Sequence, residues 1–150
     1  MSKARLLVVF GALCSSSAMA QQCEYPIADL NACPLRTARA GHAPTVNGCG
    51  PEGSTVKFPQ GVGDADFTAP CNAHDLCYET CNSKKDECDV ALAETARAEC
   101  LRAYPRAAPG VEDESWGRRA TCMSRARKYG SAVSAFGNAA YEAAQKLACD

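Results

Sequence analysis

The sequence has 150 residues, of which 47% are hydrophobic and 22% are charged, and its formal net charge is −1. A chain of this length can bury one core but not two, so we predict a single domain. The charge excludes a general nucleic-acid-binding protein, because such proteins need a cationic surface to displace counterions from phosphates. Eleven cysteines are far above ordinary usage. They indicate either a disulfide framework or metal clusters, depending on the cellular compartment.

The N-terminus has the three parts of a secretory signal peptide. Two cations precede an apolar stretch over residues 6–13, and small residues follow at residues 18–20. The apolar stretch is too short to anchor the chain in a bilayer. We therefore predict a signal peptide over residues 1–20 and a mature domain over residues 21–150, secreted to the extracellular or periplasmic space.

Cleavage after residue 20 changes the cysteine count, because it removes Cys14 from the eleven and leaves ten. An even number in an oxidising compartment predicts five disulfides, whose connectivity the spacing does not determine. The net charge of the mature domain becomes −3, since the signal peptide carries two cations and no acid. The alternative is a lipoprotein modified at Cys14, but Leu13 occupies a position that normally needs a small residue.

The mature chain begins with segments that predict little regular structure. Two prolines limit any helix in residues 21–40, and we expect Cys23 and Cys33 to tie this arm together. Residues 41–70 are rich in glycine and proline, which predicts a long loop. Long loops inside small domains are usually functional.

Helical patterns dominate the rest of the chain. We predict helices over residues 71–83 and 85–104, joined by a tight turn at Asn82-Ser83-Lys84 as an antiparallel hairpin. The alanine-rich residues 112–147 predict one or two further helices, with a break near Gly130. The fold class is therefore mainly α.

The residues that can carry chemistry are concentrated in the first of these helices. At 3.6 residues per turn, His74, Asp75 and Tyr78 share one broad face that turns toward the second helix. A neutral histidine can take a proton from water near neutral pH when an acid orients its ring. Adjacent residues on a helix point about 100 degrees apart. We therefore expect Asp75 to serve a cation and Asp89, just past the turn, to orient His74.

Each of these residues also has a simpler alternative. Asp89 can cap the second helix, and Tyr78 can fill the core. His74 and the three neighbouring cysteines can form a zinc cluster, although thiolate sites favour a reducing interior.

The run CNAHDLCYETCNSKKDECD resembles the secreted phospholipase A2 family. Its CYETC…SK…CD portion is similar to the group XII branch, and the upstream NGCGPEG is similar to the calcium loop of the family. The resemblance covers residues 47–92, roughly a third of the mature chain, and it is highly specific. It implies a small, disulfide-rich phospholipase A2-like fold with an antiparallel catalytic helix hairpin and a calcium loop.

The resemblance also implies a catalytic group. His74 corresponds to the base that activates water, Asp89 to its orienting partner, and Tyr78 to a phenol that hydrogen-bonds that acid. The implied reaction is calcium-dependent hydrolysis of the sn-2 ester of glycerophospholipids, which releases a fatty acid and a lysophospholipid. The implied substrate is a phospholipid membrane surface or micelle, and we expect a monomer with no nucleic-acid partner.

The implied cofactor is Ca²⁺. Asp75 corresponds to its carboxylate ligand, and main-chain carbonyls correspond to those of Gly48, Gly50 and Glu52. Glycines suit this role because they let successive carbonyls converge on a hard cation. The resemblance further implies a disulfide between Cys49 and the cysteine at position 71, which ties the loop to the catalytic helix. The loop differs from the common family loop at Pro51 and Glu52.

Other polar residues receive weaker roles. Glu52 is expected to be a solvated acid that offers only its carbonyl, and Asp64 and Asp66 to be solvated turn residues that could instead add a calcium contact. His42 is expected to be an exposed loop residue without a role. Residues 117–130 carry five cations and no acid beside Trp116, so they form either a solvated helix face or a surface for anionic lipid.

Two other classes of function remain open. A relative that keeps the scaffold but has lost turnover would act as a binding protein or toxin. A structural or inhibitory disulfide protein would need no metal, and a calcium titration would separate it from the other two.

Overall fold

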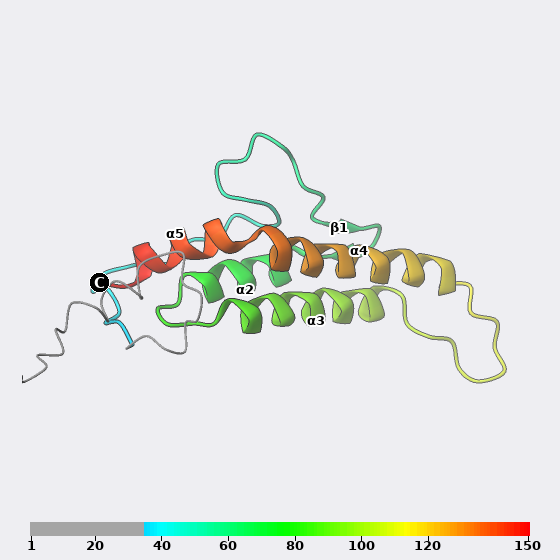
Figure 1. The fold of residues 1–150 in the computed structure, drawn as a ribbon. Helices are drawn as coiled ribbons and strands as arrows, with labels where there is room; N and C mark the ends of the chain where they lie inside the picture. Colours follow the sequence, from blue (N-terminus) through cyan, green and yellow to red (C-terminus); the bar gives the residue numbers. More distant parts are fainter. Residues whose placement is uncertain (1–34) are drawn as a thin grey trace, which may run out of the picture. The chain divides into compact units, whose positions relative to one another are not determined.

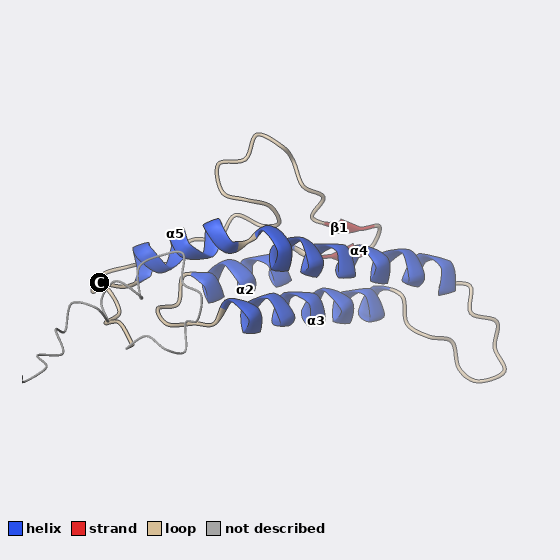
Figure 2. Cartoon of the chain, in the orientation of Figure 1, coloured by secondary structure: helices blue, strands red, loops and turns tan. Residues whose placement is uncertain are grey.

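The computed structural model describes residues 35–150, so the predicted signal peptide and the part of the predicted arm that contains Cys23 and Cys33 lie outside the described residues. The described part contains a two-stranded antiparallel sheet and helices (Figures 1 and 2). In chain order the elements are β1 (Gly61–Val62), β2 (Ala65–Asp66), α2 (Thr68–Tyr78), α3 (Lys85–Ala103), α4 (Trp116–Phe136) and α5 (Asn138–Ala148). The predicted mainly α, disulfide-rich fold is confirmed.

The predicted helix hairpin is present as α2 and α3, but α2 lies further toward the N-terminus than expected. It begins at Thr68, whose amide is capped by the carboxylate of Asp66 at 2.8 Å. Pro70 fits in the first turn because its missing N–H would have no helical partner there. The helix ends at Tyr78 rather than near residue 83. Beyond this point a side chain from α5 forms hydrogen bonds with the backbone in place of helical partners.

That side chain is Gln145, which is 1% exposed. Its amide nitrogen donates to the carbonyls of Tyr78 and Thr80, both at 2.8 Å. Its oxygen accepts from the amide of Asn82 at 3.0 Å. Asn82 has a positive φ of 63°, a conformation that asparagine tolerates better than most residues. Gln145 thus replaces a further helical turn as the partner of these backbone groups.

The predicted break near Gly130 is wrong. The chain is helical through that position and breaks at Gly137, between α4 and α5. Gly130 is buried, and a Cβ there would lie only 2.8 Å from the Cβ of Ala93. The glycine therefore allows α3 and α4 to pack closely instead of ending a helix.

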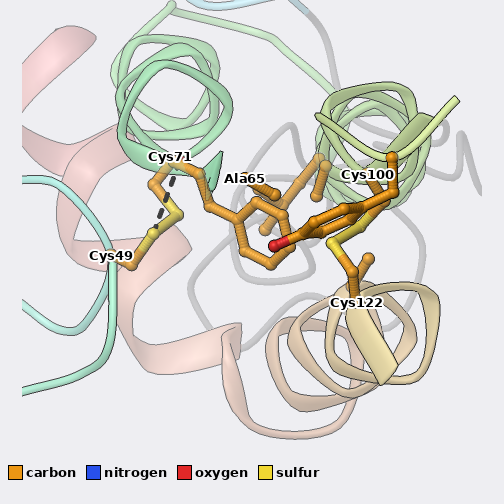
Figure 3. Packing of buried hydrophobic residues seen from close by; sticks show 10 residues of the cluster. Cys49, Ala65, Cys71, Cys100 and Cys122 are labelled. Atoms are coloured by element: carbon orange, nitrogen blue, oxygen red, sulfur yellow. Dashed lines mark hydrogen bonds between the residues drawn. A yellow bond between two sulfur atoms is a disulfide. The ribbon is translucent and has the colours of Figure 1, made fainter. Parts of the chain in front are cut away.

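The main core lies where the β hairpin meets α2, α3 and α4. Figure 3 shows Ala65 between two disulfides, Cys49–Cys71 and Cys100–Cys122. The fully buried ring of Phe67 contacts Tyr129 edge-on, with centroids 5.7 Å apart. This core holds the end of the glycine-rich loop against the helices.

Disulfides join these elements at four places in residues 35–150: Cys49–Cys71, Cys77–Cys88, Cys81–Cys149 and Cys100–Cys122. Every cysteine of the described part is therefore paired, and the pairing of the loop with α2 is the one that the family resemblance implies. A zinc cluster at His74 is excluded, because Cys71, Cys77 and Cys81 are all oxidised. No helix among residues 35–150 is long and apolar enough to cross a membrane.

Candidate active site

Three buried side chains meet between α2 and α3. Nε2 of His74 lies 2.9 Å from Oδ1 of Asp89, and the same oxygen accepts a hydrogen bond of 2.7 Å from the hydroxyl of Tyr78. The His74 and Asp89 residues are 8% and 4% exposed. The hairpin explains this arrangement, since the disulfide Cys77–Cys88 joins α2 to α3 beside the group. The structure therefore brings together the three residues that the sequence grouped as catalytic.

The hydrogen bonds determine where the histidine proton lies. Burial by itself would raise the pKa of Asp89, but hydrogen bonds from His74, Lys85 and Tyr78 lower it below its usual value. An ionised carboxylate only accepts hydrogen bonds, so the proton of the neutral ring lies on Nε2. The pKa of Tyr78 is raised, first by burial and then by Asp89, so its hydroxyl remains a donor. Nδ1 of His74 is consequently the nitrogen that can accept a proton.

Lys85, which the sequence analysis did not single out, completes this group. Its ammonium binds the second oxygen of Asp89 at 2.7 Å. It also donates to the carbonyls of Val133 at 2.9 Å and Ser134 at 3.2 Å, in the last turn of α4. A Lys four residues before an acid on a helix is a common surface pair, so only the fold reveals its position beside His74.

The glycine-rich loop lies along α2 and its C-cap residue. Asn72 and Asp75 lie on α2 and Glu79 is its C-cap, and the side chain of each accepts a hydrogen bond from a loop amide. The bonds are Gly48 N to Asn72 Oδ1 at 2.9 Å, Asn47 N to Asp75 Oδ2 at 3.1 Å, and Thr45 N to Glu79 Oε2 at 3.2 Å. The carboxylate expected to bind a cation is therefore in contact with the expected calcium loop.

Within this loop, two carbonyls converge on the side chain of Asn47. With its nitrogen turned toward them, the Asn47 amide donates to Gly48 O at 3.1 Å and to Gly50 O at 3.2 Å. A hard cation would use these same two carbonyl oxygens in place of the amide. Both glycines have positive φ, 76° and 122°, which favours glycine at each position.

The charges around Asp75 also fit a cation. Its pKa is raised, first by burial, although the hydrogen bond from Asn47 opposes this, and the charges of Glu79 and Glu52 raise it further. Among residues 35–150 no three His, Cys, Asp or Glu side chains lie close enough to hold a metal by themselves. A site here would therefore need backbone oxygens, as the convergence of Gly48 and Gly50 offers. The residues present fit Ca²⁺.

The other polar residues near the loop fit their expected positions only in part. Glu52 is exposed and acts on Asp75 through its charge, whereas the sequence analysis gave a role only to its carbonyl. Asp64 is an exposed turn residue as expected, whereas Asp66 is exposed but ends β2 and accepts the hydrogen bond from the amide of Thr68. His42 is not exposed as expected, because its side chain is 16% exposed and its Nε2 lies 3.1 Å from Glu79 Oε2. This contact lacks the geometry of a hydrogen bond, and Nε2 is a buried ring nitrogen without a hydrogen-bond partner in the described residues.

The cationic segment of α4 is not one continuous lipid-facing surface. Arg119 is buried, and it forms an ion pair with Asp113, which lowers the pKa of that carboxyl to about 2. Arg118 lies over the ring of Tyr104, 5.8 Å from its centroid. The other cations of this segment, Arg125, Arg127 and Lys128, are exposed.

Fold and site together define a disulfide-linked helical protein with a buried histidine–aspartate pair beside a glycine-rich loop. The chain matches the family model described as group XII secretory phospholipase A2 precursor over residues 13–150. It therefore belongs to the group XII secretory phospholipase A2 family. It is similar to the group XIIA secretory phospholipase A2 of Homo sapiens and to that of Mus musculus, with 42% identity over 52 residues in each case. The matched segment covers 34% of this chain and 26% of each relative. No solved structure matches the chain.

Proposed function

We propose that this protein is a secreted, calcium-dependent phospholipase A2 that hydrolyses the sn-2 ester of glycerophospholipids. The observation that carries the proposal is that α2 contacts both the proposed base and the proposed calcium loop. It places His74 against Asp89 and binds the loop through Asp75. Family membership supports a phospholipid substrate. The names of the two relatives support secretion.

In this mechanism His74 removes a proton from water through Nδ1, because Nε2 is hydrogen-bonded to Asp89. Asp89 fixes the plane of the ring and stabilises the imidazolium that forms. Tyr78 donates to the same carboxylate oxygen and limits its rotation. As the proton leaves, the water oxygen forms a bond to the sn-2 carbonyl carbon, and the bond from that carbon to the glycerol oxygen then breaks. His74 returns the proton to the departing alkoxide, so that the products are a fatty acid and a lysophospholipid.

Asp75 with the carbonyls of Gly48 and Gly50 would hold Ca²⁺, and Glu52 remains a candidate for a further carbonyl. When bound, the ion would polarise the ester carbonyl and stabilise the negative charge that develops on its oxygen. The amide of Gly50 is a second candidate donor to that oxygen. The ring of Phe58 packs against Gly50, and a Cβ at position 50 would lie 2.6 Å from it, so a larger residue does not fit there.

The test is release of fatty acid from the sn-2 position of phospholipid vesicles, with calcium or with a chelator. The parent should hydrolyse only with calcium. His74→Gln should lose at least about a thousandfold in rate while still binding calcium, since the ring is not a ligand. Asp75→Asn should weaken calcium binding and hydrolysis together, because it removes the charged ligand.

Two results would reject the proposal in different ways. Calcium binding by a parent protein that does not hydrolyse vesicles would indicate the binding protein or toxin. Calcium-dependent hydrolysis by His74→Gln at the parent rate would remove this histidine as the base.

A further inference from the structure

The ammonium group of Lys85 has an acceptor for each of its three N–H bonds. One is a carboxylate oxygen of Asp89, and the other two are carbonyls of Val133 and Ser134. The side chain is 15% exposed. A lysine that is buried to this degree and fully hydrogen-bonded has a fixed position, whereas exposed lysines sample many rotamers.

The two carbonyls belong to the last turn of α4, where the helix dipole favours a cation. The carbonyl of Val133 also accepts from the amide of Gly137 at 2.7 Å, so Lys85 is a second donor to it. The backbone there is also tight. A Cβ added at Gly137 would lie 2.7 Å from the hydroxyl of Tyr78 and 3.3 Å from Cε of Lys85. The end of α4 is thus in contact with the hydrogen-bonded group around Asp89.

The two carboxylate oxygens of Asp89 accept hydrogen bonds from different residues. Oδ1 accepts from His74 and Tyr78, and Oδ2 accepts from Lys85. If Oδ2 lost its donor, the carboxylate could rotate about its bond to the helix and Oδ1 would no longer be held in the plane of the imidazole. The ion pair therefore has a geometric consequence for the ring in addition to its Coulomb energy.

We propose that Lys85 is a positioning residue of the active site, which joins the end of α4 to Asp89 and so fixes the orientation of His74. The effect on turnover rests on the proposed function, whereas the effect on the His74–Asp89 hydrogen bond does not. The two parts can be measured separately.

The first experiment uses NMR to observe the Nε2 proton of His74 in the full-length mature protein without any substrate. Lys85→Met keeps the unbranched four-atom stem of the side chain and removes the ammonium group. We expect the resonance to shift and its exchange with solvent to accelerate at least about tenfold, because the hydrogen bond to Asp89 opens more often. Lys84→Met is the matched control, since Lys84 is exposed and pairs only with Glu87 on the same helix.

The second experiment measures kcat and KM on a short-chain phosphatidylglycerol below its micelle concentration. Lys85→Met should lower kcat about tenfold with KM nearly unchanged, because a misplaced base affects the transition state more than substrate binding. Lys85→Arg should recover most of kcat. In an Asp89→Asn background the Lys85→Met change should lower kcat less than twofold, since the lysine acts through the carboxylate.

Each outcome decides the proposal. An unchanged His74 resonance in folded Lys85→Met, or an equal loss of kcat with and without Asp89, would overturn it and leave Lys85 as a structural contact. If Lys85→Met does not fold, Lys85→Gln replaces it in both measurements. A parent protein without hydrolytic activity would refute the proposed function, and the NMR comparison would still decide the role of Lys85.

Discussion

At the scale of single residues, Asp89 is the acceptor shared by three side chains of the site. Three donors lower its pKa although burial opposes them, so its ionised form is more stable in the folded protein than in the unfolded chain. The stability that it contributes is present above the pKa of the unfolded carboxyl, about 3.9. It is lost as the pH falls through the lower pKa of the folded state.

This sign gives a prediction for Asp89→Asn. At neutral pH the variant should be less stable than the parent, because Lys85 loses its ionic partner. The difference in the free energy of unfolding should begin to shrink as the pH falls below about 4, where the carboxyl of the unfolded chain takes up a proton, and should be lost below the lower pKa of the folded parent. Urea unfolding of both proteins between pH 2 and pH 7 measures it, and a difference that grows toward acid pH would show that the three donors do not stabilise the ionised form.

At the scale of elements, the sequence predicted the hairpin of α2 and α3 because its apolar, cysteine and acid positions all follow the helical period. It did not predict the end of α2, since the groups that end it belong to α5. Nor could it distinguish a glycine that breaks a helix from one that lets two helices approach, as Gly130 does beside Ala93. Lys85 was missed for the same reason, because its carbonyl partners are 48 and 49 residues away.

The dependence of α2 on α5 can be tested at Gln145. Gln145→Leu should destabilise the protein by about 3 kcal/mol, since it leaves the buried carbonyl of Tyr78 and its neighbours without partners. Leu147→Gln, at a position that is 53% exposed, is the control and should change stability by less than about 0.5 kcal/mol. Denaturant unfolding of the two variants compares them, and equal stabilities would mean that water replaces the Gln145 amide.

At the scale of the whole molecule, the described disulfides connect elements that are distant in sequence, up to a separation of 68 residues for Cys81–Cys149. By loop entropy alone, closing a loop of that length removes about 4 kcal/mol of conformational freedom from the unfolded chain. The sequence indicated such a framework from the number of cysteines. It could not give the connectivity, which depends on which faces the helices present to one another.

The same disulfides determine whether the fragments stay joined after a protease cuts the chain. Lys57 and Arg106 are both exposed and lie in loops outside the helices. A cut after Lys57 leaves the loop attached through Cys49–Cys71, and a cut after Arg106 leaves both sides attached through Cys81–Cys149 and Cys100–Cys122. The segment between the two cuts, residues 58–106, contains every proposed catalytic side chain.

We therefore expect trypsin to cut the protein without separating its fragments. Residues 40–150 should migrate as one band in electrophoresis without reductant and as shorter chains after reduction, and release of any fragment of residues 40–150 before reduction would contradict this pairing. Wherever proteases act on it, such a molecule would remain in one piece after its loops had been cut.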